Sequence, residues 1–96
     1  MDPDSILDFM IADVVVSTAG RDQGKLFYVL DTEGEFLILA DGKGRSLENP
    51  KRKKRKHASK VIRPDTRVAE KIRAGEKVLN SELRKDLAYL SNAIGG

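Results

Sequence analysis

Residues 14–30 read VVVSTAGRDQGKLFYVL, two short apolar runs separated by a loop that contains two glycines. β-branched and aromatic residues favour strands, and glycine permits the left-handed backbone that many tight turns require. The pattern therefore predicts two antiparallel strands over residues 14–17 and 26–30. Gly20 and Gly24 are the predicted structural turn residues between them.

Three further strands are predicted downstream of this pair. Residues 35–40 read EFLILA and follow a short hairpin connection at residues 31–34. Residues 45–47 are expected to form a short fourth strand, and residues 59–63 a fifth. Five short strands joined by tight turns indicate a small barrel, because closure of the sheet removes its exposed edges.

Two helices are predicted after the barrel. Asp65 is the expected N-cap of the first helix, and Gly75 occupies the position after the helix end that glycine favours. Asn80 is the expected N-cap of the second helix. Its apolar stripe recurs at helical spacing and consists of Leu83, Leu87 and Leu90. Before the barrel, Asp2 and Pro3 are the expected start of a short helical turn.

The 96 residues are thus expected to form a mainly β fold with terminal α elements. Three parts are predicted: an N-terminal helical turn over residues 1–12, a five-stranded barrel over residues 13–63, and a C-terminal helical appendage over residues 64–96. A basic loop over residues 50–57 is expected to project from the barrel.

The net charge of +3 conceals a strong separation of charge along the sequence. Residues 1–40 carry eight acidic and two basic side chains, a balance of −6, whereas residues 41–64 carry ten basic and two acidic ones, a balance of +8. Residues 65–96 are nearly balanced at +1. Charge separation of this kind bears on binding partners rather than on fold, so the middle segment is expected to bind a polyanion.

The main candidate for that contact is the uninterrupted run of six cations from Lys51 to Lys56. Their mutual repulsion disfavours compact structure unless an anion neutralises them. A solvated, disordered loop and a localisation signal are the alternative interpretations. Held between two strands of a barrel, the run is instead expected to contact RNA phosphates together with neighbouring cations. The predicted RNA-binding residues are Arg21, Lys25, Lys43, Arg45, Lys51, Arg52, Lys53, Lys54, Arg55, Lys56, His57 and Lys60.

Few side chains are expected to read bases. Phe27, Tyr28 and Phe36 lie on predicted strands and are expected in the core. Recognition of structured RNA through its phosphate backbone and its shape is therefore favoured over base readout of a single strand.

The sequence contains few residues of the types that usually carry out enzymatic catalysis. The chain has no cysteine and a single histidine, His57, which excludes the commoner nucleophile–base pairs and zinc clusters. Residues 20–25 (GRDQGK) differ from a phosphate-binding P-loop in glycine spacing and in the strand predicted to follow. We expect no enzyme activity, catalytic residue, metal, cofactor or small-molecule substrate. The acidic N-terminus and the lack of a bilayer-length apolar run favour a cytoplasmic protein without a membrane partner.

Three short segments resemble a known family of RNA-binding proteins. They are STAGRDQGK at residues 17–25, LADGK at residues 39–43 and LENPK at residues 47–51. The first, set between two apolar strands, resembles the KOW motif. Together, within residues 13–63, the three resemble the L-fourteen-e branch of large-subunit ribosomal proteins and the small bacterial KOW-domain proteins related to it.

This resemblance implies an SH3-like (KOW) barrel, a ribosomal RNA partner within a ribonucleoprotein, and a role in translation. The terminal helices lie outside the ribosomal pattern, so a stable ribosomal component and a factor that visits RNA both stay open. A protein-interaction module is the alternative from another class, because SH3-like barrels also bind peptides. A transcription-associated KOW domain is a third.

Overall fold

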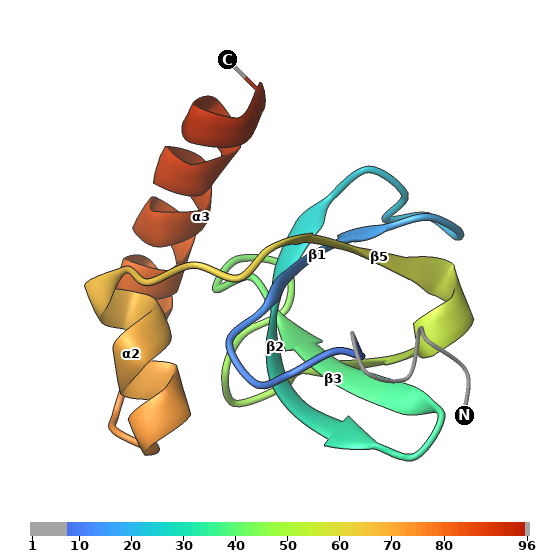
Figure 1. Ribbon diagram of the computed structural model, residues 1–96, viewed down its shortest axis with the longest axis horizontal. Coiled ribbons are helices and arrows are strands. Elements are labelled where there is room, and N and C mark those ends of the chain that lie inside the picture. Colours follow the sequence, from blue (N-terminus) through green and yellow to red (C-terminus); the bar gives the residue numbers. More distant parts are fainter. Residues whose placement is uncertain (1–7, 96) are drawn as a thin grey trace.

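The computed structural model describes residues 8–95 of the chain. Five strands form one antiparallel sheet in the order β4-β3-β2-β1-β5, and two helices pack beside it (Figure 1). The expected mainly β fold with C-terminal helices is confirmed. The strands are β1 (Val14–Ser17), β2 (Leu26–Glu33), β3 (Phe36–Ala40), β4 (Lys51–Lys54) and β5 (Ala58–Ile62); the helices are the 3₁₀ helix η1 (Arg55–His57), α2 (Arg67–Ala74) and α3 (Asn80–Gly95).

The longest strand, β2, bends the sheet. Its first part pairs with β1, where Val14 lies opposite Tyr28, and its second part pairs with β3. The register with β3 shifts between Val29 and Asp31, which marks a bulge, and a bulge increases both bend and twist. The sheet is consequently strongly curved, and η1 joins its two edge strands β4 and β5 (Figure 1).

Both faces of the sheet bury apolar side chains, which explains why its central strands are almost continuously apolar. One cluster lies on the face turned away from the helices and consists of Val15, Phe27, Val29, Leu37 and Leu39. The other faces the helices, where Val14 and Tyr28 pack with Leu83, Leu87 and Leu90 of α3. The predicted leucine stripe therefore packs on the sheet, as its helical spacing requires.

The fourth strand was placed wrongly by the sequence pattern. Residues 45–47 form turns, and the strand is Lys51–Lys54, within the segment 50–57 that was expected to be a basic loop. It pairs with β3, so that Lys51 lies opposite Leu39 and Lys54 opposite Phe36. An edge strand tolerates lysine because one of its sides faces solvent, and lysine also discourages edge-to-edge association.

The helix ends differ slightly from expectation. Thr66, not Asp65, caps α2: its hydroxyl accepts a hydrogen bond from the Ala69 amide at 3.2 Å. Gly75 ends the helix, as predicted. Asn80 is not the cap of α3 but lies within it, and its side-chain oxygen accepts the Leu47 amide at 2.8 Å. The asparagine thus anchors the segment between β3 and β4 instead of the helix start.

The helical turn predicted over residues 1–12 falls mostly outside the described residues. Residues 8–12, which are described, contain no helix. In the described part of the chain, no helix combines the length and apolar character needed to cross a membrane.

The turn after β3 is fitted closely against the start of α3. Gly42 has a left-handed backbone (φ 77°), and a Cβ atom there would lie 2.4 Å from the backbone oxygen of Asn80. The Gly42 oxygen also accepts a hydrogen bond from Arg84 at 2.8 Å. Only glycine allows the turn and the helix to approach this closely.

We predict that Gly42→Ala destabilises the fold more than Gly24→Ala does. Both glycines have left-handed backbones, but a Cβ on Gly24 would meet no atom within 4 Å. The conformational strain of about 1–2 kcal/mol is common to both variants, whereas the clash with Asn80 adds about 1–3 kcal/mol to Gly42→Ala alone. Urea unfolding measures the difference, and equal destabilisation would show that the turn does not press on α3.

Candidate nucleic-acid interface

The extended backbone of β4 divides the basic run between two sides of the molecule. Successive side chains of a strand point in opposite directions. Lys51 and Lys53 both form ion pairs with Asp22, at 2.5 and 3.2 Å. Arg52 points away from them, forms an ion pair with Glu33 at 3.5 Å and lies over the Phe36 ring. The run is therefore not one continuous cationic surface.

Asp22 is the centre of a buried polar cluster. Its carboxylate accepts hydrogen bonds from the Ser17 hydroxyl at 2.7 Å and from the Lys51 ammonium at 2.5 Å, while Lys53 also donates to the Ala19 oxygen at 2.9 Å. Burial by itself raises the pKa of Asp22, but the hydrogen bonds from Lys51, Ser17 and Lys53 outweigh it and hold that pKa well below the usual range.

The side-chain partners of Asp22 come from β1 and β4. Lys53 was predicted to bind RNA, but its side chain is only 7% exposed. Lys51 and Lys53 thus serve mainly to fasten the loop at residues 18–25 to β4. We call Ser17, Asp22, Lys51 and Lys53 the Asp22 cluster.

Two more predicted RNA-binding residues are occupied by acidic or backbone partners. Arg55 forms an ion pair with Asp8 and donates to the Gly34 oxygen at 2.6 Å. Lys60 lies 3.6 Å from the buried carboxylate of Asp13 and donates to the Asp8 oxygen at 3.0 Å. These cations contribute to the structure, so less of their charge is available to an external ligand.

Four predicted cations are exposed on two loops, and none of these four forms an ion pair with another residue among those described. Arg21 and Lys25 lie on the loop between β1 and β2; Lys43 and Arg45 lie on the loop between β3 and β4. Arg21, Lys25 and Arg45 line one cavity of about 310 Å³. Lys25 and Lys43 line a second, larger one of about 600 Å³.

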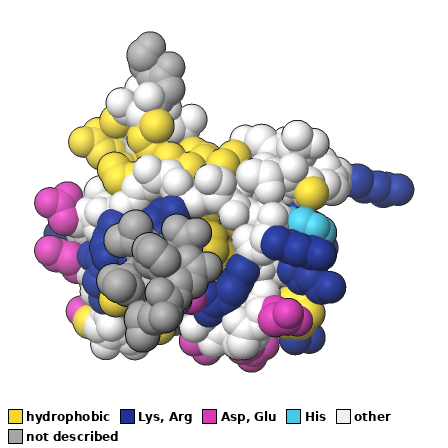
Figure 2. Space-filling model, turned by 45° about the vertical axis from the view of Figure 1, so that its right-hand side comes forward, with side chains coloured by type: hydrophobic (Ala, Val, Ile, Leu, Met, Phe, Trp, Pro, Cys, Tyr) yellow, Lys and Arg dark blue, Asp and Glu magenta, His cyan; other side chains and the backbone are white. Residues whose placement is uncertain are grey.

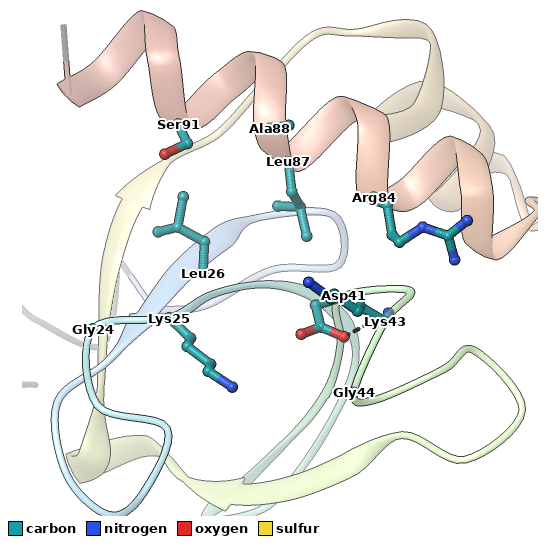
Figure 3. A pocket seen from close by; sticks show the side chains of 10 residues that line it. All are labelled: Gly24, Lys25, Leu26, Asp41, Lys43, Gly44, Arg84, Leu87, Ala88 and Ser91. Atoms are coloured by element: carbon teal, nitrogen blue, oxygen red, sulfur yellow. Dashed lines mark hydrogen bonds between the residues drawn. The ribbon is translucent and has the colours of Figure 1, made fainter.

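The two cavities adjoin, because Lys25, Asp41 and Gly44 line both. We call the larger one the loop groove; it lies between the two loops and α3 (Figure 3). The α3 residues that line it are Arg84, Leu87, Ala88 and Ser91. Arg84 was not predicted, because the sequence places it on a segment of almost no net charge, far from the other cations.

Local hydrogen bonds hold both loops in shape. One oxygen of Asp41 accepts the amides of Lys43 and Arg45, each at 2.9 Å. On the other loop, Gly24 donates to the Ser17 oxygen at 2.8 Å. Gly20 and Gly24 have left-handed backbones (φ 89° and 90°), which confirms them as turn residues. The four exposed cations on these two loops are consequently held by ordered turns.

A second cationic surface lies at the junction of β4 and β5. Lys54 and Lys56 are exposed, His57 is partly exposed, and the two lysines line a cavity of about 250 Å³ with Glu35 and Arg55. Figure 2 shows lysine and arginine side chains around the single histidine. Ten of the twelve predicted RNA-binding residues thus lie on two surfaces or in the Asp22 cluster, whereas Arg52 and Lys60 pair with acidic side chains elsewhere.

Comparison with protein families and with curated proteins identifies no relative of this chain. The chain matches no protein-family model, and no curated protein matches its sequence. Among residues 8–95, no group of three or more histidine, cysteine, aspartate or glutamate side chains is placed to hold a metal ion.

We predict that two adjacent substitutions in β4 differ in their effect on stability. Lys53→Ala removes a buried ion pair with Asp22 and should lower the free energy of unfolding by about 1.5–3 kcal/mol. Lys54→Ala alters an exposed side chain and should stay within about 0.5 kcal/mol of the parent. Urea unfolding of the two variants provides the measurement. Equal effects would contradict the structural role of Lys53.

We also predict that Asp22 makes the fold sensitive to acid. An unfolded aspartate takes up a proton near pH 3.9, whereas Asp22 in the folded state stays ionised to lower pH. The stability that this carboxylate contributes is therefore complete above about pH 4 and declines as pH falls further.

The substitution Asp22→Asn should remove that part of the pH dependence. Its free energy of unfolding should be lower than that of the parent at neutral pH and should change less between about pH 4 and 2. Asp65→Asn, which alters an exposed carboxylate, should follow the parent curve. Parallel curves for the parent and Asp22→Asn would exclude Asp22 as a source of acid sensitivity.

Proposed function

We propose that this chain is a non-enzymatic, cytoplasmic RNA-binding protein built on an SH3-like barrel of the KOW type. Its ligand is structured RNA, ribosomal RNA in particular, bound through phosphate and shape contacts. The three motif segments at residues 17–25, 39–43 and 47–51 support this assignment. The curved five-stranded sheet, with bulged β2 and a 3₁₀ connection from β4 to β5, is compatible with a partly open barrel.

The observation that carries the proposal is the convergence of cations from two separate loops. Arg21, Lys25, Lys43 and Arg45 are exposed and surround two adjoining cavities. Each is free of ion pairs to other described residues, so no internal salt bridge has to break before a phosphate binds. Ordered turns also reduce the entropy lost when the cations bind their ligand.

The Asp22 cluster supports the same proposal indirectly. By forming ion pairs with Lys51 and Lys53, Asp22 helps β4 to hold its place beside β3, and it holds the loop of Arg21 and Lys25 against β4. Lys54 and Lys56 then supply a second contact region at the other end of β4. An extended RNA can contact both surfaces, because backbone recognition requires spaced cations and not one dense patch.

We predict that a double substitution at the loop groove weakens RNA binding through phosphate contacts. Lys25→Ala with Lys43→Ala should lower the affinity for a hairpin RNA. It should also flatten the log–log salt dependence by roughly 0.7–0.9 for each phosphate that the protein no longer neutralises. Thermal stability should change little, because both side chains are exposed. Titration at several salt concentrations measures the slope.

The matched control removes the same charge elsewhere. Arg67→Ala with Lys77→Ala alters two exposed cations that line neither cavity. It should retain the parent's salt slope. If the two double variants show the same fall in affinity and the same change in slope, net charge alone drives binding and the loop groove is not the interface.

A further inference from the structure

The loop groove combines an apolar floor with a charged rim. Leu26 from β2 and Leu87 from α3 point toward the same space, and Ala88 exposes its methyl group beside them (Figure 3). Lys25 and Lys43 stand on the two loops at its border. Phosphate contacts need only the cations, so an apolar floor indicates a ligand that also has an uncharged, poorly hydrated part.

Arg84 of α3 stands at one end of the same groove (Figure 3). It lines the groove and is exposed, while one of its nitrogens donates to the Gly42 oxygen at 2.8 Å. That hydrogen bond restrains the side chain before any ligand binds. In RNA-binding proteins, unpaired bases stack on aromatic rings or on arginine planes, and among residues 8–95 no aromatic side chain lines this groove.

Asp41 adds a hydrogen-bond acceptor to this surface. Its Oδ1 atom is occupied by the Lys43 and Arg45 amides, whereas Oδ2 has no hydrogen-bond partner among residues 8–95. The carboxylate points into the groove (Figure 3). A carboxylate repels phosphate but accepts N–H groups from the edge of a base.

We infer that the loop groove binds one unpaired nucleotide of the RNA. The base lies against Leu26, Leu87 and Ala88 and stacks on Arg84, its N–H edge faces Asp41, and the flanking phosphates lie at Lys25 and Lys43. The volume of about 600 Å³ is adequate, since pockets for small organic ligands span roughly 300–1,000 Å³. The inference rests on the proposed RNA-binding function and specifies its ligand: a structured RNA with a bulged or looped-out nucleotide.

The test compares two hairpin RNAs that are identical except for one unpaired adenosine in the stem. Fluorescence anisotropy of the full chain with each hairpin measures the affinities. We expect the parent to bind the bulged hairpin about tenfold more tightly, the size of effect that one stacked base produces.

Ala88→Leu fills the groove without changing any charge. It should lower the affinity for the bulged hairpin and abolish its preference over the fully paired one. Ala93→Leu is the matched control, because Ala93 is also exposed on α3 but does not line the groove. This control should behave as the parent does, and circular dichroism verifies that both variants are folded.

The outcomes separate this inference from the function on which it rests. If the parent binds both hairpins equally, RNA binding stands and the nucleotide pocket is wrong. If Ala88→Leu weakens both hairpins alike, the groove carries only phosphate contacts, and the pocket is again wrong. If the parent binds neither hairpin, the proposed function itself fails.

Discussion

Asp22 accepts charged hydrogen bonds from two lysines of β4 in a place from which most water is excluded. Without this carboxylate, the Lys53 ammonium would be buried with no opposite charge beside it, and a buried unpaired charge is strongly destabilising. The pairing lets a run of six cations form a strand at the edge of the sheet. It also fixes the loop that carries Arg21 and Lys25. The ion pairs of Asp22 with Lys51 and Lys53 therefore both hold β4 in the sheet and determine the positions of these two exposed cations.

Tyr28 has a comparable role between the sheet and the helices. It lies opposite Val14 in β1 and opposite Ala40 in β3, and its side chain is fully buried. Its hydroxyl group donates to Asp86 of α3, which also accepts a hydrogen bond at 2.8 Å from Thr66, the N-cap of α2. Burial, and then the Asp86 carboxylate, raise the pKa of Tyr28. One side chain thus fixes α3 relative to β2, and with it the separation between the helix and the two loops.

The sequence was sufficient for those features that depend on neighbouring residues. Apolar runs located four of the five strands, helical spacing located the leucines of α3, and the left-handed backbones of Gly20 and Gly24 followed from their place in a turn. It was insufficient where a distant partner decides the outcome. The basic run forms a strand with the help of Asp22, about thirty residues earlier, which forms ion pairs with two of its lysines. Likewise, Asn80 binds Leu47 instead of capping its own helix.

The same limit applies to the candidate site, where Arg84 is the residue that sequence reasoning missed. A helix with balanced charge adds little long-range attraction for a polyanion, so net charge gives no reason to expect a ligand contact on α3. Short-range recognition depends instead on which individual side chain the packing presents. Leu83 and Leu87 bury one side of α3 against the sheet, which turns Arg84 toward Gly42 and the loop groove. The residues that make α3 a structural element are therefore also the ones that orient its cation toward the loop groove.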